Sequence, residues 1–347
     1  MKIRTMLLSM LFCMCLSVYA LADKMYNTDI VVVGSVAGGL TSAMAAVENG
    51  LKVVILEKMP AVGGTGNYME GTFAVGSDLQ LRENLTLNVE KQFEKVMTFH
   101  HWRVDPEVVR TWLTRSPENL RWLESMGFEF TKVMTAFPDG PRTWHMFPGG
   151  HGSSVMQLFH QKITAAGGTI LTETPVKSLI IENGRVAGVV AEDGDGEKVT
   201  VRAKAVIMAS GGFPYNKEMM EKYVGFGYNL IGPSGRTGDG LRMMEGAGAE
   251  LVGMNVVLQA GFWINNLAAD LQFGKNAKYI KMMATFHQPY LYVSKDGRRP
   301  VDETKPVEFV SNAFELHRTN EAFMIFDQNT KLLLEKEGFQ RPLYDLV

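Results

Sequence analysis

The sequence has few cysteines and almost no net charge. Its 347 residues contain two cysteines, Cys13 and Cys15, and 35 basic against 37 acidic side chains. This balance excludes the strongly basic domain or stripe that is typical of nucleic-acid binding, so no nucleic-acid partner is expected. The seven histidines are scattered and form no HExxH motif, and we therefore expect no metal site.

Long apolar runs are also rare, and the one that stands out is N-terminal. Lys2 and Arg4 precede it, residues 5–18 carry no charge, and Ala20-Leu21-Ala22 has the pattern of a signal-peptidase site. The run is shorter than the about 20 residues that a membrane-spanning helix needs. This favours a Sec-type signal peptide at residues 1–22 over a membrane anchor. Its cleavage would remove both cysteines and release a periplasmic or secreted protein without stable membrane insertion.

Glycine, in contrast, is abundant, and its first cluster follows an apolar segment. Residues 29–33 predict a buried parallel strand. The turn Gly34-Ser35-Val36-Ala37-Gly38-Gly39 follows, then a helix at 40–49 and a second strand at 52–56 that ends at Glu57. This order is the Rossmann fingerprint: a glycine turn and helix N-terminus for a pyrophosphate, and an acid for the ribose hydroxyls.

One position departs from that fingerprint. Val36 stands where the second glycine would let the backbone approach the pyrophosphate closely. Gly34 and Gly39 still allow the tight turn and the close packing of helix on strand. Gly38 is expected to relieve some of the steric crowding that Val36 causes. The alternative is an α/β protein whose glycine turn binds nothing.

A second glycine-rich segment follows the acid. Glu57-Lys58 is succeeded by Gly63-Gly64-Thr65 and then by Glu70-Gly71. Together these motifs resemble the flavoprotein family of soluble fumarate reductases, succinate dehydrogenase flavoprotein subunits and 3-ketosteroid dehydrogenases. The resemblance implies that the cofactor is FAD, and that this segment wraps its pyrophosphate and approaches the flavin ring.

Three further motifs extend the resemblance over about residues 29–330: Thr174-Pro175-Val176, Ala209-Ser210-Gly211-Gly212-Phe213 and Gly238-Asp239-Gly240. The resemblance implies that the backbone at Val176 faces the adenine and that the other two motifs lie near the cofactor. The fingerprint and the resemblance together assign FAD to Gly34, Gly38, Gly39, Glu57, Lys58, Gly63, Gly64, Thr65, Gly71, Val176, Ser210, Gly211 and Asp239.

We expect an α/β fold with two domains after the signal peptide. Residues 23–252 predict a Rossmann-like FAD-binding domain, a parallel sheet with inserted β-hairpin strands whose turn is Asn183-Gly184. Residues 253–347 predict the start of an α+β capping domain for the substrate. Nothing after Thr330 resembles the family's segment that returns to the FAD domain, so the chain is expected to be C-terminally truncated.

The resemblance implies hydride transfer between flavin and a substrate carbon beside an activating carboxylate or carbonyl. Gly261 stands where fumarate reductases have a substrate histidine, and residues 304–307 lack the catalytic arginine that follows a stretch similar to 295–303. We therefore expect an FAD-dependent oxidoreductase of a small unsaturated organic acid or carbonyl compound other than fumarate. Since no CxxCH haem motif occurs, electrons would come from a cytochrome or a flavin-carrying partner.

Three side chains are weak catalytic candidates: His145, His287 and Arg299. His145 precedes the glycine-rich residues 149–152 and a predicted helix at 153–166, and a histidine can act as an acid near neutral pH. A structural role fits His145 equally well, and a solvated hairpin explains Arg299. The alternative for the whole chain is a non-catalytic remnant that binds dinucleotide weakly or not at all, which Val36 and the missing clamp residues favour.

Overall fold

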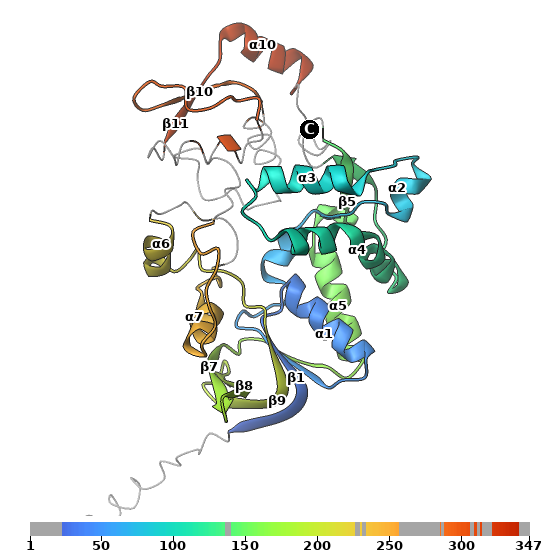
Figure 1. Cartoon of the computed structure of the whole chain (residues 1–347), viewed down its shortest axis with the longest axis vertical. Helices are drawn as coiled ribbons and strands as arrows, with labels where there is room; N and C mark the ends of the chain where they lie inside the picture. The colour runs from blue at the N-terminus through green and yellow to red at the C-terminus, as the bar shows by residue number, and fades with distance from the viewer. Residues whose placement is uncertain are drawn as a thin grey trace, which may run out of the picture. The chain divides into compact units, whose positions relative to one another are not determined.

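The structure is a computed structural model of the whole chain and describes residues 23–135, 140–225, 230, 234–256, 285, 288–305, 309–310, 313 and 321–339. The chain forms two compact units, coloured along the sequence in Figure 1. Unit 1 comprises Met1–Val62, Ile163–Ser210 and Arg242–Ala249, and unit 2 comprises Gly63–Lys162, Gly211–Leu241 and Glu250–Val347. The expected domain of residues 23–252 thus includes two whole segments of unit 2 and the first residues of its third, and the predicted boundaries stay a prediction.

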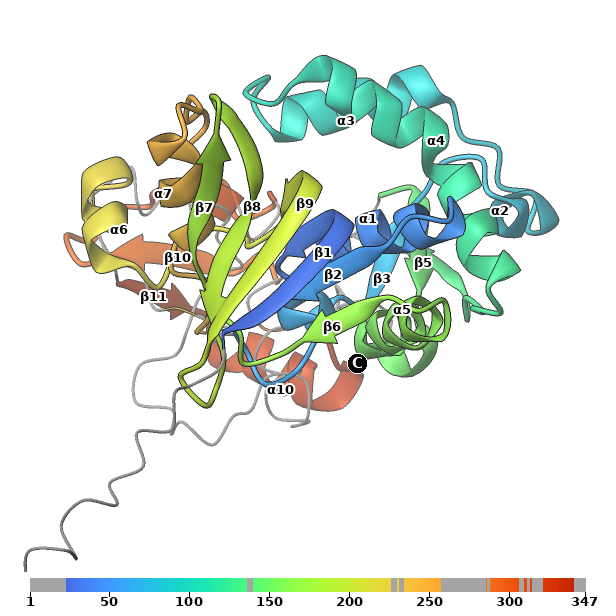
Figure 2. The same ribbon diagram turned by 90° about the horizontal axis from the view of Figure 1, so that it is seen from below.

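Unit 1 contains a six-stranded sheet of order β6-β2-β1-β9-β8-β7, which Figure 2 shows from below. Strands β6, β2, β1 and β9 run parallel to one another, whereas β8 is antiparallel to β9 and forms an antiparallel hairpin with β7. The expected parallel sheet with inserted hairpin strands is confirmed. The strands are β1 (Lys24–Val33), β2 (Val53–Leu56), β6 (Thr169–Leu171), β7 (Val176–Glu182), β8 (Arg185–Glu192) and β9 (Lys198–Met208).

The core of this sheet is aliphatic. Val31, Val33, Val54 and Leu56 are buried at the ends of β1 and β2, and α1 (Ala37–Glu48) buries Gly39, Leu40 and Ala43. The small side chains of α1 allow its backbone to lie close to the strands. β6 and β7 are separate strands, and Pro175, which lies between them, has no N–H for a sheet ladder.

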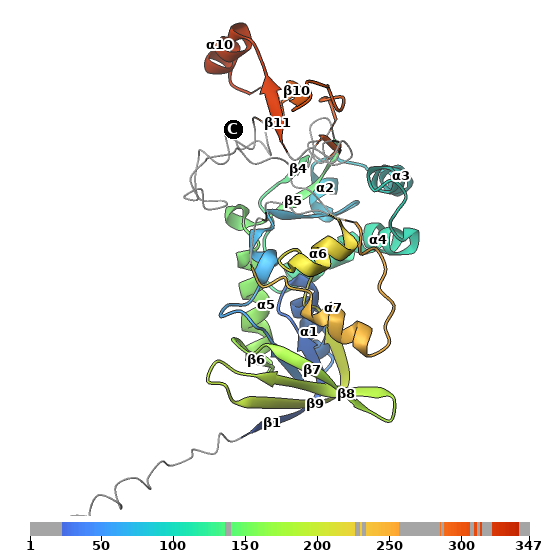
Figure 3. The ribbon, with the colours of Figure 1, turned by 90° about the vertical axis from the view of Figure 1, so that its left-hand side faces the viewer.

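Unit 2 contains the antiparallel sheet β3-β5-β4 and the antiparallel pair β10-β11; Figure 3 labels β4, β5, β10 and β11. Helices α3 and α4 lie side by side (Figure 1) and bury Phe93, Met97, Val109 and Leu113 between them. The elements are η1 (Gly64–Tyr68), β3 (Gly71–Phe73), α2 (Asp78–Arg82), α3 (Val89–Phe99), α4 (Pro106–Ser125), β4 (Val133–Thr135), β5 (Arg142–Met146), η2 (Pro148–Gly150), α6 (Lys217–Tyr223), β10 (Leu291–Ser294), β11 (Ala322–Ile325) and α10 (Gln328–Glu337); α5 (Ser153–Ala165) and α7 (Asp239–Gly246) cross the unit boundaries.

Helix α4 is continuous through Pro117, a residue type that often interrupts a helix. A proline inside a helix removes the hydrogen bond to the carbonyl four residues earlier, here that of Leu113. The hydroxyl of Ser116 donates to this carbonyl oxygen at 2.8 Å instead. Leu113 and Leu120 are buried and hold the helix against the core on both sides of the proline.

Within the residues that the structure describes, no helix combines the length and the apolar character needed to cross a membrane. The same residues contain no group of three or more side chains placed to hold a metal ion.

Candidate cofactor site

The first glycine turn lies at the carboxyl edge of the sheet of unit 1. Gly34 follows β1 with φ of +100°, and a Cβ added there would lie 2.5 Å from the carbonyl oxygen of Ala209, which follows β9. A Cβ on Gly39 would lie 2.0 Å from the carbonyl oxygen of Gly34. Both positions therefore require glycine, because any side chain would break the contact between turn, helix and strand.

The outer side of this turn is open. A Cβ on Gly38 would meet no atom within 4 Å, and no side chain caps the N-terminus of α1. Val36 is the N-cap residue, half-buried and extended, with φ of −81° and ψ of −177°. The positive end of the helix dipole thus lies at the glycine turn, an arrangement suited to a phosphate group.

Glu57, at the end of β2, anchors the turn. Its carboxylate is buried, and Oε2 accepts hydrogen bonds from the backbone N–H of Ser35 at 2.9 Å and from its hydroxyl at 2.6 Å. Oε1 accepts from the backbone N–H of Met59 at 2.8 Å. The acid therefore joins the glycine turn to the loop that leads out of unit 1.

The predicted motif Thr174-Pro175-Val176 begins with a residue that is hydrogen-bonded to Glu57. The backbone N–H of Thr174 donates to the carbonyl oxygen of Glu57 at 2.9 Å, and Val176 begins β7 as a buried residue. Unit 1 therefore brings Gly34, Glu57 and the Ala209-Ser210 motif to the carboxyl ends of the neighbouring strands β1, β2 and β9, with Thr174 bonded to Glu57. In open α/β sheets this edge is where ligands bind.

The second glycine segment is packed within unit 2. Gly63 has φ of +100°, and a Cβ there would lie 2.4 Å from Asn67 Oδ1. A Cβ on Gly152 would lie 1.9 Å from the carbonyl oxygen of Gly66, so the segment lies directly against the start of α5. Gly64 and Thr65, both half-buried, occupy the η1 turn between these contacts.

The last two predicted motifs also meet in unit 2. The N–H of Gly238 donates to the carbonyl oxygen of Gly212 at 3.1 Å, and Gly238 has φ of +77° with Met219 packed against it. Asp239, at the start of α7, accepts a hydrogen bond from the Thr237 hydroxyl at 2.8 Å. Gly211 thus precedes a turn that also positions Asp239.

His145 is fully buried in β5. Its Nδ1 lies 3.1 Å from the carbonyl oxygen of Thr143, and its Nε2 lies 2.6 Å from the hydroxyl oxygen of Ser77. A carbonyl only accepts, so Nδ1 carries the proton and the Ser77 hydroxyl donates to Nε2. Burial lowers the pKa of His145 below its ordinary value, against smaller raising effects of backbone hydrogen bonds. The neutral imidazole ties β5 to α2, and a catalytic role for His145 stays a prediction.

Arg299 is paired with a buried acid. Its guanidinium Nε lies 3.0 Å from both carboxylate oxygens of Glu303, and the Glu303 side chain is 4% exposed. The backbone N–H of Tyr292 also donates to this carboxylate, at 3.1 Å. A catalytic role for Arg299 stays a prediction, and His287 and Gly261 lie outside the described residues.

Comparison with known proteins identifies the family. Residues 29–321 match the family described as FAD binding domain. The chain belongs to this family. The resemblance that the glycine motifs indicated is therefore confirmed, and so are the fold class and FAD as the cofactor.

Relatives of this FAD-binding chain include a vinyl phenol reductase of Lactiplantibacillus plantarum, 30% identical over 89% of this chain and 63% of the relative. A cytochrome-type fumarate reductase of Shewanella frigidimarina is 27% identical over 91% of this chain and 55% of the relative. The 3-ketosteroid-Δ4-(5α)-dehydrogenase of Rhodococcus jostii RHA1 has the same fold, with a TM-score of 0.70 and 21% identity over 90% of this chain and 69% of that one. The chain thus spans less than two thirds of the length of these two reductases.

The residues of unit 1 fit FAD. A carboxylate offers about four acceptor positions, and the hydrogen bonds from Ser35 and Met59 use three of those of Glu57, which leaves one for a ribose hydroxyl. The space beside Gly38 and the cradle formed by Gly34 and Gly39 leave room for a pyrophosphate at the start of α1.

Two polar side chains of unit 2 were not assigned a role by the sequence. Burial raises the pKa of Glu70, which directly precedes Gly71. Trp144 carries a buried indole N–H without a hydrogen-bond partner. Both belong to motifs that stand out in the sequence, Glu70-Gly71 and Thr143-Trp144-His145, but neither motif indicates which group is buried.

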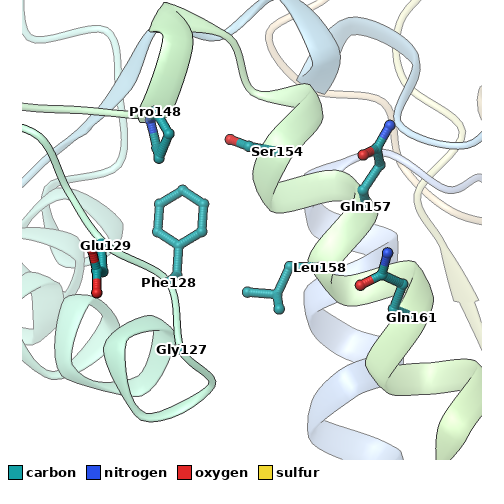
Figure 4. A pocket seen from close by; sticks show the side chains of 8 residues that line it. All are labelled: Gly127, Phe128, Glu129, Pro148, Ser154, Gln157, Leu158 and Gln161. Atoms are coloured by element: carbon teal, nitrogen blue, oxygen red, sulfur yellow. The ribbon is translucent and has the colours of Figure 1, made fainter.

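A cavity of about 410 Å³ lies elsewhere in unit 2 and includes none of the predicted site residues. Figure 4 shows its apolar part, formed by Phe128, Pro148 and Leu158, and the glutamines of α5 beside it. Its lining residues are Gly127, Phe128, Glu129, Pro148, Ser154, Gln157, Leu158 and Gln161.

Proposed function

We propose that the protein is an FAD-dependent oxidoreductase that transfers hydride between the flavin and an activated, unsaturated organic acid or carbonyl compound. The observation that carries the proposal is the hydrogen-bonding of Glu57 to Ser35 at the edge where β1, β2 and β9 end. It fixes a dinucleotide-type turn in a chain of the FAD-binding family. FAD, when bound, supplies the hydride-transfer chemistry.

The chain's own residues have binding and orienting roles in this proposal. Gly34 and Gly39 keep side chains away from the pyrophosphate, and the first N–H groups of α1 face its negative charge. Glu57 accepts a ribose hydroxyl through its remaining acceptor position. In unit 2, the packed segment from Gly63 to Gly71 and Asp239 are the further residues assigned to the cofactor.

The proposed substrate class comes from chemistry that two relatives share. A vinyl phenol and fumarate, named in the descriptions of those reductases, both contain a carbon–carbon double bond conjugated to another π system. Such conjugation stabilises the charge that develops when hydride adds to one end of the bond. Gly261 and the arginine-free residues 304–307 favour an unsaturated substrate other than the dicarboxylate.

The test uses the full chain purified and reconstituted with FAD. We expect a bound-flavin absorbance band near about 450 nm and oxidation of a reduced viologen dye on addition of 4-vinylphenol, a hydroxycinnamate, acrylate or an enone, with fumarate as the comparison. Absence of the flavin band would refute the cofactor assignment for this chain. A flavin band without oxidation by any of these compounds would refute the reductase assignment alone.

A non-catalytic remnant is the second candidate, and Val36 favours it. Its isopropyl group lies at the turn where the fingerprint has glycine, which hinders close approach of a pyrophosphate. Under this alternative, FAD binds weakly or not at all to the purified chain while the fold is retained.

We also propose that residues 1–22 direct export and that a cytochrome or a flavin-carrying protein donates the electrons. The basic start, apolar run and Ala20-Leu21-Ala22 support export. N-terminal sequencing of periplasmic protein should begin at Asp23, and an uncleaved cytoplasmic product would refute export. Rapid reduction of the reconstituted protein by NADH alone would refute the separate electron donor.

A further inference from the structure

Trp144 occupies a position in the sheet of unit 2 that depends on a glycine. It lies in β5 directly opposite Phe73 of β3, and alternate strand residues share a face, so Gly71 lies on the same face, diagonal to Trp144. A Cβ on Gly71 would lie 2.8 Å from Trp144 Nε1 and 2.4 Å from the carbonyl oxygen of His145. Gly71 therefore makes the space that the indole N–H occupies.

The indole N–H is the unusual group at this place. Among the residues that the structure describes, Trp144 Nε1 is the buried side-chain nitrogen or oxygen that has no hydrogen-bond partner. Such groups are rare in native proteins, and each needs an explanation, because an unpaired buried donor destabilises the fold. A bound molecule would supply the missing acceptor.

The surroundings of this N–H indicate what kind of acceptor it meets. Gly71 ends the glycine segment that is assigned to FAD, and the residues opposite Trp144 on the neighbouring strands are Phe73 and Met134. An indole N–H donates but does not accept, and it brings no charge to balance a phosphate. A flat ring with carbonyl oxygens and ring nitrogens along its edge fits these surroundings, and the flavin of FAD is such a ring.

We propose that Trp144 donates its indole N–H to a carbonyl oxygen or ring nitrogen of the flavin. The inference rests on the proposed function, since it requires FAD to bind. A hydrogen bond strengthens when its acceptor gains negative charge. Trp144 therefore makes the bound flavin easier to reduce, in addition to strengthening its binding.

The test compares Trp144→Phe with Trp122→Phe in the full chain. Trp122 is also half-buried in unit 2, where its ring packs 5.5 Å from that of Phe159, so the control loses the same indole. Three quantities are measured: the FAD dissociation constant by fluorescence titration, the flavin midpoint potential by dye equilibration, and the thermal unfolding midpoint of the apoprotein. Trp144→Phe should weaken FAD binding about five- to twentyfold and make the potential more negative, while the control changes neither.

A second replacement separates the N–H from the volume of the ring. 3-Benzothienylalanine, incorporated at position 144 by stop-codon suppression, keeps the size of indole but has sulfur in place of the N–H. It should weaken FAD binding and shift the potential as Trp144→Phe does, and the apoprotein should unfold at the wild-type temperature or above it, because an unpaired buried donor has been removed. A lower apoprotein midpoint with unchanged FAD affinity and potential would overturn the inference.

The failure of this inference is distinguishable from that of the proposed function. If the wild-type chain binds FAD and both replacements bind it equally well with an unchanged potential, only the inference about Trp144 is overturned. If the wild-type chain binds no FAD, the proposed function is overturned, and the inference with it.

Discussion

The carboxylate of Glu57 accepts both the backbone N–H and the hydroxyl of Ser35, a residue 22 positions earlier in the chain. The contact joins the ends of β1 and β2 and fixes the glycine turn between them. A third hydrogen bond, from the N–H of Met59, extends this link to the loop that leaves unit 1. One acid thus organises the glycine turn and the loop that the sequence predicts to bind the dinucleotide.

Replacement of this acid should therefore affect both folding and binding. In Glu57→Gln, the amide NH₂ must face either Ser35 or the N–H of Met59, so a donor meets a donor in a buried place. We expect the free energy of unfolding to fall by about 1–3 kcal/mol and FAD binding to weaken, as measured by urea denaturation and by titration. Glu192→Gln, at a largely exposed site, is the control, and equal stability of the two variants would contradict the role of Glu57.

The two adjacent glycines at the start of α1 should behave in opposite ways. Gly39→Ala brings a Cβ within 2.0 Å of the carbonyl oxygen of Gly34, and we expect a loss of about 3 kcal/mol of stability. Gly38→Ala meets nothing within 4 Å and should leave stability unchanged or raise it by up to about 1 kcal/mol.

The measurement for this pair is urea denaturation combined with FAD titration. If Gly38 makes room for the pyrophosphate, Gly38→Ala weakens FAD binding although it does not destabilise the protein. Unchanged FAD affinity in Gly38→Ala would show that Gly38 is not part of the pyrophosphate site.

What the sequence could predict in this protein is local. The apolar run of β1, the turn at Gly34 and the acid at Glu57 form a continuous pattern whose parts meet because they lie on adjacent parallel strands, so the edge of unit 1 was predictable. The continuity of α4 was not, since it depends on the Ser116 hydroxyl replacing a hydrogen bond that Pro117 removes. Likewise, no local pattern places Ser77 against His145, 68 residues later.

The protonation of His145 should make stability depend on pH. Burial lowers its folded-state pKa, so below the unfolded value of about 6.5 the unfolded chain takes up a proton that the folded protein excludes. Stability is therefore fully present above that pH and is lost as the pH falls toward the folded pKa. In His145→Gln the slope of unfolding free energy between pH 5 and 6.5 should decrease, by at most about 1.4 kcal/mol per pH unit.

His100 is the control for that experiment, because partial desolvation of this exposed side chain and the neighbouring His101 lower its pKa as well. His100→Gln should change the slope less than His145→Gln does, because His100 lies on the surface. An unchanged slope in His145→Gln would show that this imidazole is protonated freely in the folded protein, as a catalytic acid would be.

Arg299 and its neighbour Arg298 offer a matched pair. Burial alone would raise the pKa of Glu303, but Arg299 and backbone N–H groups lower it overall, so its contribution to stability is present above about pH 4.5 and is lost as the pH falls. Arg299→Gln should lower the urea midpoint at neutral pH and make this loss of stability on acidification smaller, because the folded-state pKa of Glu303 rises toward its unfolded value. Arg298→Gln, at an 80% exposed side chain, should do neither, and normal stability with lost turnover in Arg299→Gln would instead support a catalytic role.

Val36→Gly tests whether the departure from the fingerprint limits binding of FAD. Val36 is the N-cap of α1, a position where glycine is preferred over valine. This preference offsets the entropic cost of glycine in the unfolded chain, so we expect the stability to change by less than about 1 kcal/mol. Removal of the isopropyl group lets the backbone approach the pyrophosphate, and we expect FAD to bind about five- to tenfold more tightly by fluorescence titration. Val47→Gly, near the other end of the helix, should lose stability without that gain. If Val36→Gly binds FAD no better than the wild-type chain does, Val36 does not limit FAD binding. Val36 would then no longer support the alternative that the chain is a non-catalytic remnant.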